Sequence, residues 1–376
     1  MKIKRLTTEN FRNLQIKSED LAPAVNIVFG ENGAGKTSLL EAVTILGNLR
    51  SFRTTNLRRV VRHGEDSFRL FGEVGSDDHT RRLEQIVDVG PPVRRRLFVD
   101  SHEVTVETYL QVFPVFSITG SDRELIRGGP EGRRALLDRF LFLLGSSHLG
   151  DIRLYRRALK QRNAALRSGA SDTELETWEA SLAAAGARVV TARTAGAQTL
   201  EKRFSEVLGA LAGEDGFPIA VEYRGESWLG ARNEPKKVEE TYFQRYNETR
   251  TRDRLMGFTV DGPHRHDLSL RTDGRGVRHV LSTGQTKVVA AALRLATLAQ
   301  VEKERHEHFP VVVDDVDAEL DESALARLID YLGSKRQLFL SSTSEKVATA
   351  AGPGSHRLWI VDGNSVSVRQ EANFNE

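Results

Sequence analysis

The chain has 376 residues, of which 39% are hydrophobic and 28% are charged, and its formal net charge is +2. This composition excludes a disordered acidic or basic tail protein, because the apolar content suffices for a core and the net charge is small. A chain of this length predicts two domains or one large, elaborated domain.

The cellular compartment is indicated by what the sequence lacks. The absence of Cys excludes a disulfide scaffold and thiolate-based metal sites or nucleophiles, and it fits a reducing cytoplasm. No run of about 18 apolar residues occurs, so no membrane-spanning helix is predicted. Residues 1–5 are followed by a segment with interspersed polar residues instead of an apolar segment, so no secretory signal is predicted. We therefore expect a cytoplasmic protein without a membrane partner.

Arginine supplies 42 of the 54 basic residues. Its guanidinium presents a rigid fork of N–H donors that suits phosphate and carboxylate groups. This bias favours a polyanionic partner, although a GC-rich genome would produce the same bias.

The first third of the chain predicts strands around one helix. Apolar residues recur at Ile3, Leu6 and Phe11, and the apolar run 25–29 ends at Gly30. A helix is predicted from Lys36, and its apolar face is expected to carry Leu39, Leu40, Val43, Leu46 and Leu49. Residues 66–119 alternate between strand-like stretches and turn clusters, which predicts an antiparallel sheet whose last strand is 112–118.

The middle of the chain, from about 130 to 212, is predicted to be helical, being rich in Ala, Leu and Arg with no Pro after Pro130 until Pro218. The segment 213–263 is mixed. The later predicted elements are strands at 267–281, a helix from about 285 to 304, a strand at 311–313, a helix near 322–333, and strands at 337–342 and 357–362. We therefore predict one α/β unit, built from the first and last parts of the chain and interrupted by a helical insertion.

Residues 30–37 match the pattern G-x-x-x-x-G-K-[ST], directly after an apolar strand and before a helix. The glycines let backbone N–H groups turn around phosphate oxygens at a helix start, where the dipole is positive. Lys36 is expected to reach the β- and γ-phosphates of ATP, and the Thr37 hydroxyl is expected to ligate Mg²⁺. The predicted nucleotide-binding residues are Gly30, Glu31, Asn32, Gly33, Ala34, Gly35, Lys36, Thr37, Ser38 and Arg12. The alternative is a plain glycine-rich turn.

A second part of the site is predicted where the apolar run 309–313 ends in Asp314 and Asp315. Ligands bind at the carboxyl ends of buried parallel strands. Asp314 is therefore predicted to hold Mg²⁺, and Asp315 to orient or deprotonate the attacking water, so that Lys36, Asp314 and Asp315 form the catalytic set. The alternative is a turn in which both carboxylates cap the following helix.

Ser282, Thr283, Gly284 and Gln285 open the long predicted helix. A serine and free N–H groups at a helix start form a phosphate receptor, although Ser282 also fits an ordinary N-cap. The order along the chain is a P-loop, this serine-rich start, the strand with paired carboxylates, and then residues 319–321. That order resembles the ABC-type ATPases, in which the serine-rich signature faces the γ-phosphate of the partner subunit.

The long separation of Ser282 from Lys36 indicates an insertion between two lobes, as in the SMC-like ATPases, with an arm too short for a long coiled coil. Across nearly the whole chain the sequence resembles the RecF family of recombination-repair ATPases. The motifs that carry this resemblance are 10–13 (NFRN), 51–54 (SFRT), 129–134 with 137–138, 160–166 (KQRNAAL), 262–267 (GPHRHD) and 281–285 (LSTGQ). Two positions depart from the family pattern: Gly120-Ser121-Asp122 stands where many members have Pro-Glu-Asp, and His266 replaces a more usual acidic or small residue.

The resemblance implies an α/β ABC-type head, with a mixed sheet and an antiparallel subdomain, plus a short helical arm. Its expected parts are lobe I at 1–125, the arm at 126–260 and lobe II at 261–376. It further implies a slow DNA-stimulated ATPase, nucleoid-associated and cytoplasmic, that forms an ATP-dependent homodimer. Such a protein binds gapped or junction DNA and cooperates with RecO and RecR to load RecA. The alternatives are an SMC-like nucleotide-gated scaffold, an ABC-type ATPase subunit of another assembly such as a transporter, and a P-loop small-molecule kinase.

Two basic clusters are candidates for the DNA surface. One follows the P-loop helix at 50–63, and the other lies on the helix that begins at Asp151, opposite its apolar stripe. The candidate DNA-binding residues are Arg53, Arg58, Arg59, Arg156 and Arg157. Few aromatic residues interleave with either cluster, so phosphate contacts with little sequence specificity are expected. The alternative is that both clusters are ordinary solvated faces.

Overall fold

The computed structural model describes most of the chain. The described residues are 1–14, 16, 19–31, 33–76, 78–145, 147–213, 217–230, 234–316, 322–333, 335–343 and 347, together with the backbone of 356–361 and 365–369. They divide into two compact units, each described here by itself. The first comprises 1–123, 207–216 and 282–376, and the second comprises 124–206 and 217–281. Among the described residues, no helix has both the length and the apolar character that a membrane crossing needs.

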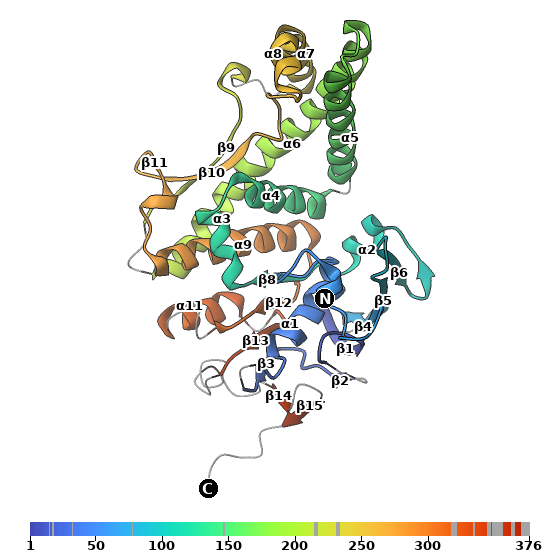
Figure 1. The fold of residues 1–376 in the computed structure, drawn as a ribbon. Coiled ribbons are helices and arrows are strands. Elements are labelled where there is room, and N and C mark those ends of the chain that lie inside the picture. The colour runs from blue at the N-terminus through green and yellow to red at the C-terminus, as the bar shows by residue number, and fades with distance from the viewer. Residues whose placement is uncertain are drawn as a thin grey trace. The chain divides into compact units, whose positions relative to one another are not determined.

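The first unit contains a six-stranded sheet in the order β15-β14-β3-β13-β12-β8. Its strands are β3 (Val25–Phe29), β8 (Phe116–Ile118), β12 (Val311–Val313), β13 (Leu338–Ser341), β14 (His356–Val361) and β15 (Ser365–Arg369). Neighbouring strands run parallel except β14 and β15, which pair antiparallel. Because β3, β13 and β12 lie side by side and parallel, their carboxyl ends meet at one edge of the sheet (Figure 1).

The central strands of this sheet and helix α1 (Lys36–Asn48), which follows β3, are buried. The residues of β12 and β13 are all buried, as expected for strands covered on both faces. Residues 38–47 of α1 are also all buried, so α1 is a core helix with no polar face, although the predicted apolar positions are indeed inside. Helices α9 (Thr283–Arg305) and α11 (Glu322–Leu332) complete the described helices that accompany this sheet.

An antiparallel sheet in the order β2-β1-β4-β5-β6-β7 belongs to the same unit. Its strands are β1 (Lys2–Glu9), β2 (Glu19–Asp20), β4 (Ser67–Gly75), β5 (Thr80–Asp88), β6 (Arg94–Val99) and β7 (His102–Glu103). Alternate apolar residues of these strands, such as Leu6, Leu70 and Leu83, pack with α1 in one core cluster. This alternation is the period expected for a sheet with one buried face.

The prediction that 112–118 forms the last strand of the antiparallel sheet is wrong. Residues Val106–Val112 form helix α2, whose start is capped by the Thr105 side chain accepting a hydrogen bond from Thr108 N. Only Phe116–Ile118 is a strand, and it pairs parallel with β12. A short apolar run does not reveal its strand partner, because buried parallel and antiparallel strands are equally apolar at this length.

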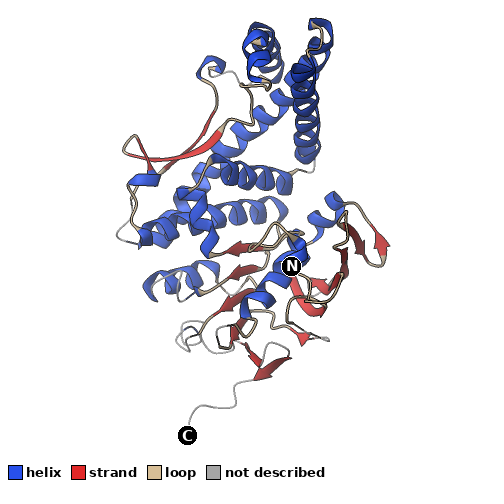
Figure 2. Ribbon diagram, in the orientation of Figure 1, coloured by secondary structure: helices blue, strands red, loops and turns tan. Residues whose placement is uncertain are grey.

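Helices dominate the second unit (Figure 2). They are α3 (Arg123–Arg127), α4 (Pro130–Leu144), α5 (Ser147–Ser168), α6 (Asp172–Ala212, which continues into the first unit), α7 (Pro235–Glu248) and α8 (Arg250–Met256). A three-stranded antiparallel sheet accompanies them, in the order β11 (Arg275–Gly276), β10 (Asp267–Thr272), β9 (Ala220–Arg224). The described residues of the segment 213–263, whose sequence is mixed, include strand β9, the short 3-10 helix η4 (Ser227–Leu229) and helices α7 and α8.

Arg162 holds three parts of the second unit together. Its guanidinium is fully buried and donates to Asp253 at 2.8 Å, to Glu179 at 3.0 Å and to Thr259 at 2.7 Å. A buried charge is tolerated only when paired and hydrogen-bonded, and removing one partner of such a pair typically costs several kcal/mol. The KQRNAAL motif therefore contributes a structural cross-link through Arg162.

Candidate nucleotide-binding site

Residues 30, 31 and 33–35 belong to the loop between β3 and α1. Gly33 and Gly35 have φ values of +87° and +116°, a region that L-residues with a Cβ rarely adopt. Lys36 is the first residue of α1, and its Nζ donates to Gly30 O at 2.6 Å and Glu31 O at 3.0 Å. The loop, the lysine and the start of a buried helix thus have the local geometry of a phosphate cradle.

A turn from the N-terminal segment supports this loop. Asn13 Nδ2 donates to Ala34 O at 3.4 Å, and a Cβ on Gly35 would lie 3.2 Å from Leu14 Cδ2. A hydrogen bond from Arg12 N to Val60 O, at 2.7 Å, fixes this N-terminal segment. Arg12 itself has φ +46°, an uncommon conformation for a residue other than glycine. The NFRN motif is therefore packed directly against the cradle.

The paired carboxylates lie at the carboxyl end of β12, next to the end of β13. Ser341, the last residue of β13, donates its hydroxyl to Asp314 Oδ1 at 2.7 Å and accepts a hydrogen bond from Asp315 N at 2.7 Å. The Thr37 side chain lies close enough to Asp314 to lower the pKa of its carboxyl, so the first turn of α1 lies close to the end of β12. The structure thus brings together Thr37 and Asp314, the predicted Mg²⁺ ligands.

Burial raises the pKa of Asp314 above its ordinary value, and the neighbouring Asp315 acts in the same direction. Hydrogen bonds from Ser341 and Thr37 and the charge of Arg53 oppose this shift. A desolvated carboxylate beside a hydroxyl oxygen suits Mg²⁺, which prefers hard oxygen ligands and would stabilise the charged form. Asp315 differs from Asp314, because its side chain is exposed and its backbone has φ +55°.

Glu41 is a site residue that the sequence did not reveal. It is fully buried in α1 and accepts hydrogen bonds from Arg12 Nε and Nη2 and from Ser51 Oγ. Arg53 Nη1 lies 3.7 Å from the same carboxylate. The signal in the sequence was a single acidic residue inside the apolar run of α1, flanked by Leu40 and Ala42. Ser341 was also missed, and its signal was a hydroxyl at the end of a predicted apolar strand.

Ser282 is the N-cap of α9. Its Oγ accepts a hydrogen bond from Gln285 N at 3.2 Å, and Gln285 Oε1 accepts from Ser282 N at 3.0 Å, which completes a capping box. Residues 282–285 are all exposed. Ser282 is therefore an N-cap, as the alternative predicted, and its Oγ acts as the hydrogen-bond acceptor. Among the described residues, no group accepts a hydrogen bond from its hydroxyl. No described hydrogen bond or ion pair joins 282–285 to the cradle of the same chain.

The candidate DNA-binding residues occupy two different settings. Arg58 and Arg59 are exposed on the short 3-10 helix η1 (Leu57–Arg59) of the first unit. Arg156 and Arg157 are exposed on α5 in the second unit, opposite buried Ile152 and Tyr155. Arg53 instead lies beside Glu41 and influences Asp314, so it belongs spatially to the cradle.

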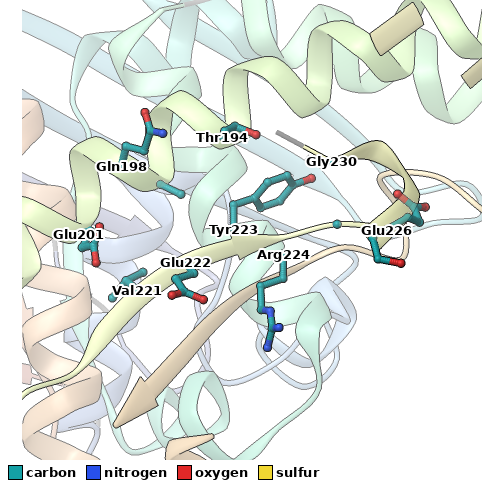
Figure 3. A pocket seen from close by; sticks show the side chains of 12 residues that line it. Thr194, Gln198, Glu201, Val221, Glu222, Tyr223, Arg224, Glu226 and Gly230 are labelled. Carbon is teal, nitrogen blue, oxygen red and sulfur yellow. The ribbon is translucent and has the colours of Figure 1, made fainter. Parts of the chain in front are cut away.

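A pocket of about 460 Å³ lies in the second unit between α6 and β9. Figure 3 shows Thr194, Gln198 and Glu201 on the helix and the side chains of β9 across from them. Three carboxylates and one arginine line it, namely Glu201, Glu222, Glu226 and Arg224. This excess of negative charge is unsuited to a triphosphate, and none of the predicted nucleotide-binding or DNA-binding residues lines it. Asn32 and residues 319–321 lie outside the described part of the chain.

Comparisons with known proteins identify the family of this chain. The family model for the RecF/RecN/SMC N terminal domain matches residues 2–361. The DNA replication and repair protein RecF of Anaeromyxobacter sp. (strain Fw109-5) is 34% identical over 373 residues, which are 98% of this chain and 99% of that protein. The DNA replication and repair protein RecF of Haemophilus influenzae is 31% identical over 348 residues, or 92% of this chain and 93% of that protein.

Solved structures extend the likeness to the fold. The recombination mediator protein RecF-ATP of the RecFOR pathway is similar with a TM-score of 0.87 and 26% identity, covering 98% of this chain and 99% of that chain. An Smc head bound to the C-winged helix domain of ScpA has a TM-score of 0.55 at 15% identity, with 98% of each chain covered, and supports the fold alone. Both the predicted ABC/SMC-type α/β head and the predicted family are thus confirmed, and the chain belongs to the RecF family.

Proposed function

We propose that this chain is an ATP-dependent DNA-binding protein of recombinational repair and replication. It binds ATP with Mg²⁺, forms a homodimer through the nucleotide, engages gapped or junction DNA and hydrolyses ATP slowly to reset. Together with RecO and RecR it helps RecA to load. The observation that carries this proposal is the meeting of the cradle, Thr37 and Asp314 at one edge of the parallel sheet.

The residues of the cradle account for nucleotide binding. Backbone N–H groups of 33–37 and the Lys36 ammonium supply positive charge for the phosphates, and the N-terminus of α1 adds its dipole. Thr37 and Asp314 are the residues that would hold Mg²⁺, which when bound offsets negative charge on the β- and γ-phosphates. The relative whose structure is described as RecF-ATP supports ATP as the nucleotide.

Asp315 accounts for slow hydrolysis. Its exposed carboxylate accepts a proton from a water molecule while the water oxygen attacks the γ-phosphorus. The bond between the γ-phosphorus and the bridging oxygen breaks, and ADP leaves with that oxygen. Ser341 holds the backbone N of Asp315, which limits the orientations that the carboxylate can take.

We assign DNA contact to exposed arginines of this chain, and we infer the protein partners from the description of a solved relative. Arg58 and Arg59 follow α1 closely in the chain, so nucleotide binding at the start of α1 can influence them through the loop at 51–56. The solved relative is described as a recombination mediator of the RecFOR pathway, which supports RecO and RecR as partners. A nucleotide-gated scaffold remains the rival function, and it differs in showing no ATP turnover on DNA.

Substitution of Lys36 by Met tests the nucleotide site. We expect Lys36→Met to abolish measurable ATP binding, because it removes the long cation of the P-loop segment 30–37. Isothermal titration calorimetry with ATP and Mg²⁺ measures this, with a thermal melt to show that the variant is folded. An ATP affinity equal to that of the wild type would remove the P-loop assignment and the proposed function with it.

A further inference from the structure

Glu41 presents an unusual arrangement of charge. Its carboxylate is fully buried, yet it faces two guanidinium groups, those of Arg12 and Arg53. Arg12 donates from Nε and from Nη2, the latter to Glu41 Oε1 at 2.9 Å, and Ser51 Oγ donates to the same Oε1. The single negative charge of Glu41 therefore pairs with two arginine side chains, which leaves a net positive charge beside Glu41.

The groups that Glu41 holds come from the two segments next to the cradle. Arg12 belongs to the turn whose Asn13 and Leu14 contact Ala34 and Gly35. Ser51 and Arg53 belong to the loop that follows α1, and Ser51 Oγ also accepts hydrogen bonds from Arg53 N at 2.9 Å and Thr54 N at 3.0 Å. Glu41 lies on the helix that starts at Lys36, so it links both segments to the element that carries the cradle.

Both guanidiniums retain donors for another anion. Arg12 uses Nε and Nη2 on Glu41, and its Nη1 has no partner among the described residues. The Arg53 guanidinium lies 3.7 Å from Glu41, the Arg53 side chain is 42% exposed, and its charge also acts on Asp314. A guanidinium that is fixed along one edge and free along the other is preorganised to donate to a phosphate.

We propose that Glu41 is a positioning residue of the nucleotide site, which orients Arg12 and Arg53 so that their free N–H groups face the terminal phosphate. The inference rests on the proposed ATP binding and adds to it the basis for preferring ATP over ADP. Without its charge, the two arginines repel each other and lose their common anchor, so the surplus positive charge is no longer held at the cradle.

Glu302 offers a matched comparison in the same unit. Its carboxylate is also nearly buried, accepts hydrogen bonds from Arg336 Nε at 3.0 Å and Nη2 at 2.6 Å, and lies on α9. None of its described partners belongs to the cradle, the NFRN turn or the loop at 51–54. A buried glutamate that serves folding alone should behave as Glu302 does.

The test compares Glu41→Gln with Glu302→Gln, using calorimetric titration with ATP and with ADP and a thermal melt of each variant. We expect Glu41→Gln to lower ATP affinity about tenfold, the size of one strong charge-assisted contact, with little change in ADP affinity. Glu302→Gln should lower the melting temperature and leave the ratio of ATP to ADP affinity unchanged. In an Arg12→Gln/Arg53→Gln background, Glu41→Gln should have no further effect on ATP affinity, because the groups it orients are gone.

Equal losses of ATP and ADP affinity in Glu41→Gln, or no loss of either, would overturn the inference while leaving the P-loop assignment intact. If Glu41→Gln does not fold, Ser51→Ala replaces it. This variant removes the hydrogen bond to Glu41, together with those that Ser51 Oγ accepts from Arg53 N and Thr54 N, without removing either charge. A selective loss of ATP affinity in Ser51→Ala supports the inference, and unchanged selectivity contradicts it. Absence of ATP binding by the wild-type protein is a different result, because it removes the proposed function itself.

Discussion

Two adjacent carboxylates in this site have different environments. Asp314 is half-buried beside Ser341 and Thr37, whereas Asp315 is exposed and has a left-handed backbone. Burial raises the pKa of Asp314, so its charged form gains from a nearby cation. The exposed Asp315 is accessible to solvent. This difference supports a division in which Asp314 holds the metal and Asp315 acts on the water.

Replacement of Asp315 by Asn tests this division. We expect Asp315→Asn to bind ATP normally but to slow hydrolysis by about a hundredfold or more, because an amide does not accept the proton of the attacking water. The ATP-bound dimer should accumulate in consequence. Calorimetry and a phosphate-release assay measure the two effects. Turnover at the wild-type rate would place the base elsewhere and leave the metal as the role for Asp314.

Some residues of the site could be predicted from the sequence, and others could not. The glycines and Lys36 were predictable because their spacing is local and fixed by the phosphate they surround. The partner of Arg12 was not, since Glu41 lies 29 residues away and its burial appears only when α1 enters the core. Arg53 was grouped with the basic cluster at 50–63 because its charge is visible in the sequence and its contacts with Glu41 are not.

At the scale of elements, the GPHRHD segment before β10 is a structural junction of the second unit. Arg193 Nη1 donates to Pro263 O at 2.7 Å, Tyr155 Oη lies 2.6 Å from His264 Nδ1, and Arg133 Nε donates to Asp267 at 2.8 Å. The segment therefore joins α4, α5 and α6 to the small sheet. His266, the departure from the family pattern, is buried against Glu226, Tyr223 and Tyr242.

This junction predicts a loss of stability in mild acid. Burial lowers the pKa of His264 to about 4, against 6.5 for an ordinary histidine. The unfolded chain therefore takes up the proton first, and the free energy of unfolding should fall as pH drops from 6.5 to about 4, by about 3 kcal/mol at pH 4. The pKa values of Glu226 and Asp138 are lowered in the folded protein. The stability that these two carboxylates contribute is therefore lost only as pH falls from the ordinary carboxyl range towards their lowered pKa values.

Urea unfolding at several pH values measures this effect, and His264→Gln is the matched variant. Its amide keeps a hydrogen-bonding group near Tyr155 but does not titrate, so the variant should lose less stability between pH 6.5 and 4.5 than the wild type. Parallel curves for the two proteins would show that His264 does not govern this pH range.

Most elements were predictable, and the errors have physical causes. Long periodic segments such as α5 and α9 and the apolar strands β3 and β12 were expected in nearly their observed places. Helices α7 and α8 were not, because the segment 213–263 interrupts its pattern with Gly and Pro. The pairing of β8 with β12 joins residues almost 200 positions apart, and no local pattern reveals such a partner.

At the scale of the whole molecule, we predict that DNA binding depends mainly on contacts between arginine side chains and DNA phosphates. DNA affinity should fall steeply with salt, and loss of one phosphate-contacting arginine should lower the slope of log K against log salt by about one. Arg58→Ala and Arg59→Ala come first, followed by Arg156→Ala and Arg157→Ala. Fluorescence anisotropy with a gapped duplex over a salt series measures the slope.

Arg188 provides the control for this series. It is similarly exposed but already pairs with Asp151 at 2.6 Å, so Arg188→Ala should leave the slope nearly unchanged. If neither pair of test variants changes affinity or slope, both clusters are ordinary solvated faces, and DNA must bind elsewhere.

The central claim is that two chains complete each other's nucleotide sites. Within one chain, no described hydrogen bond or ion pair joins 282–285 to the cradle, and these residues are exposed at the start of α9. A two-fold pair is self-complementary, so we propose that in the ATP-bound dimer each chain gives its Ser282 to the partner's γ-phosphate. Ser282→Arg should therefore bind ATP as a monomer but fail to dimerise, because a bulky side chain occupies the close contact.

The most direct measurement is ATP hydrolysis by an equal mixture of Ser282→Arg and Lys36→Met chains, with light scattering of each variant alone. A mixed dimer keeps one intact composite site, in which Lys36 of the serine variant faces Ser282 of the lysine variant. We predict that each variant alone is inactive and that mixing restores part of the hydrolysis. An ATP-dependent dimer formed normally by Ser282→Arg alone would contradict the claim.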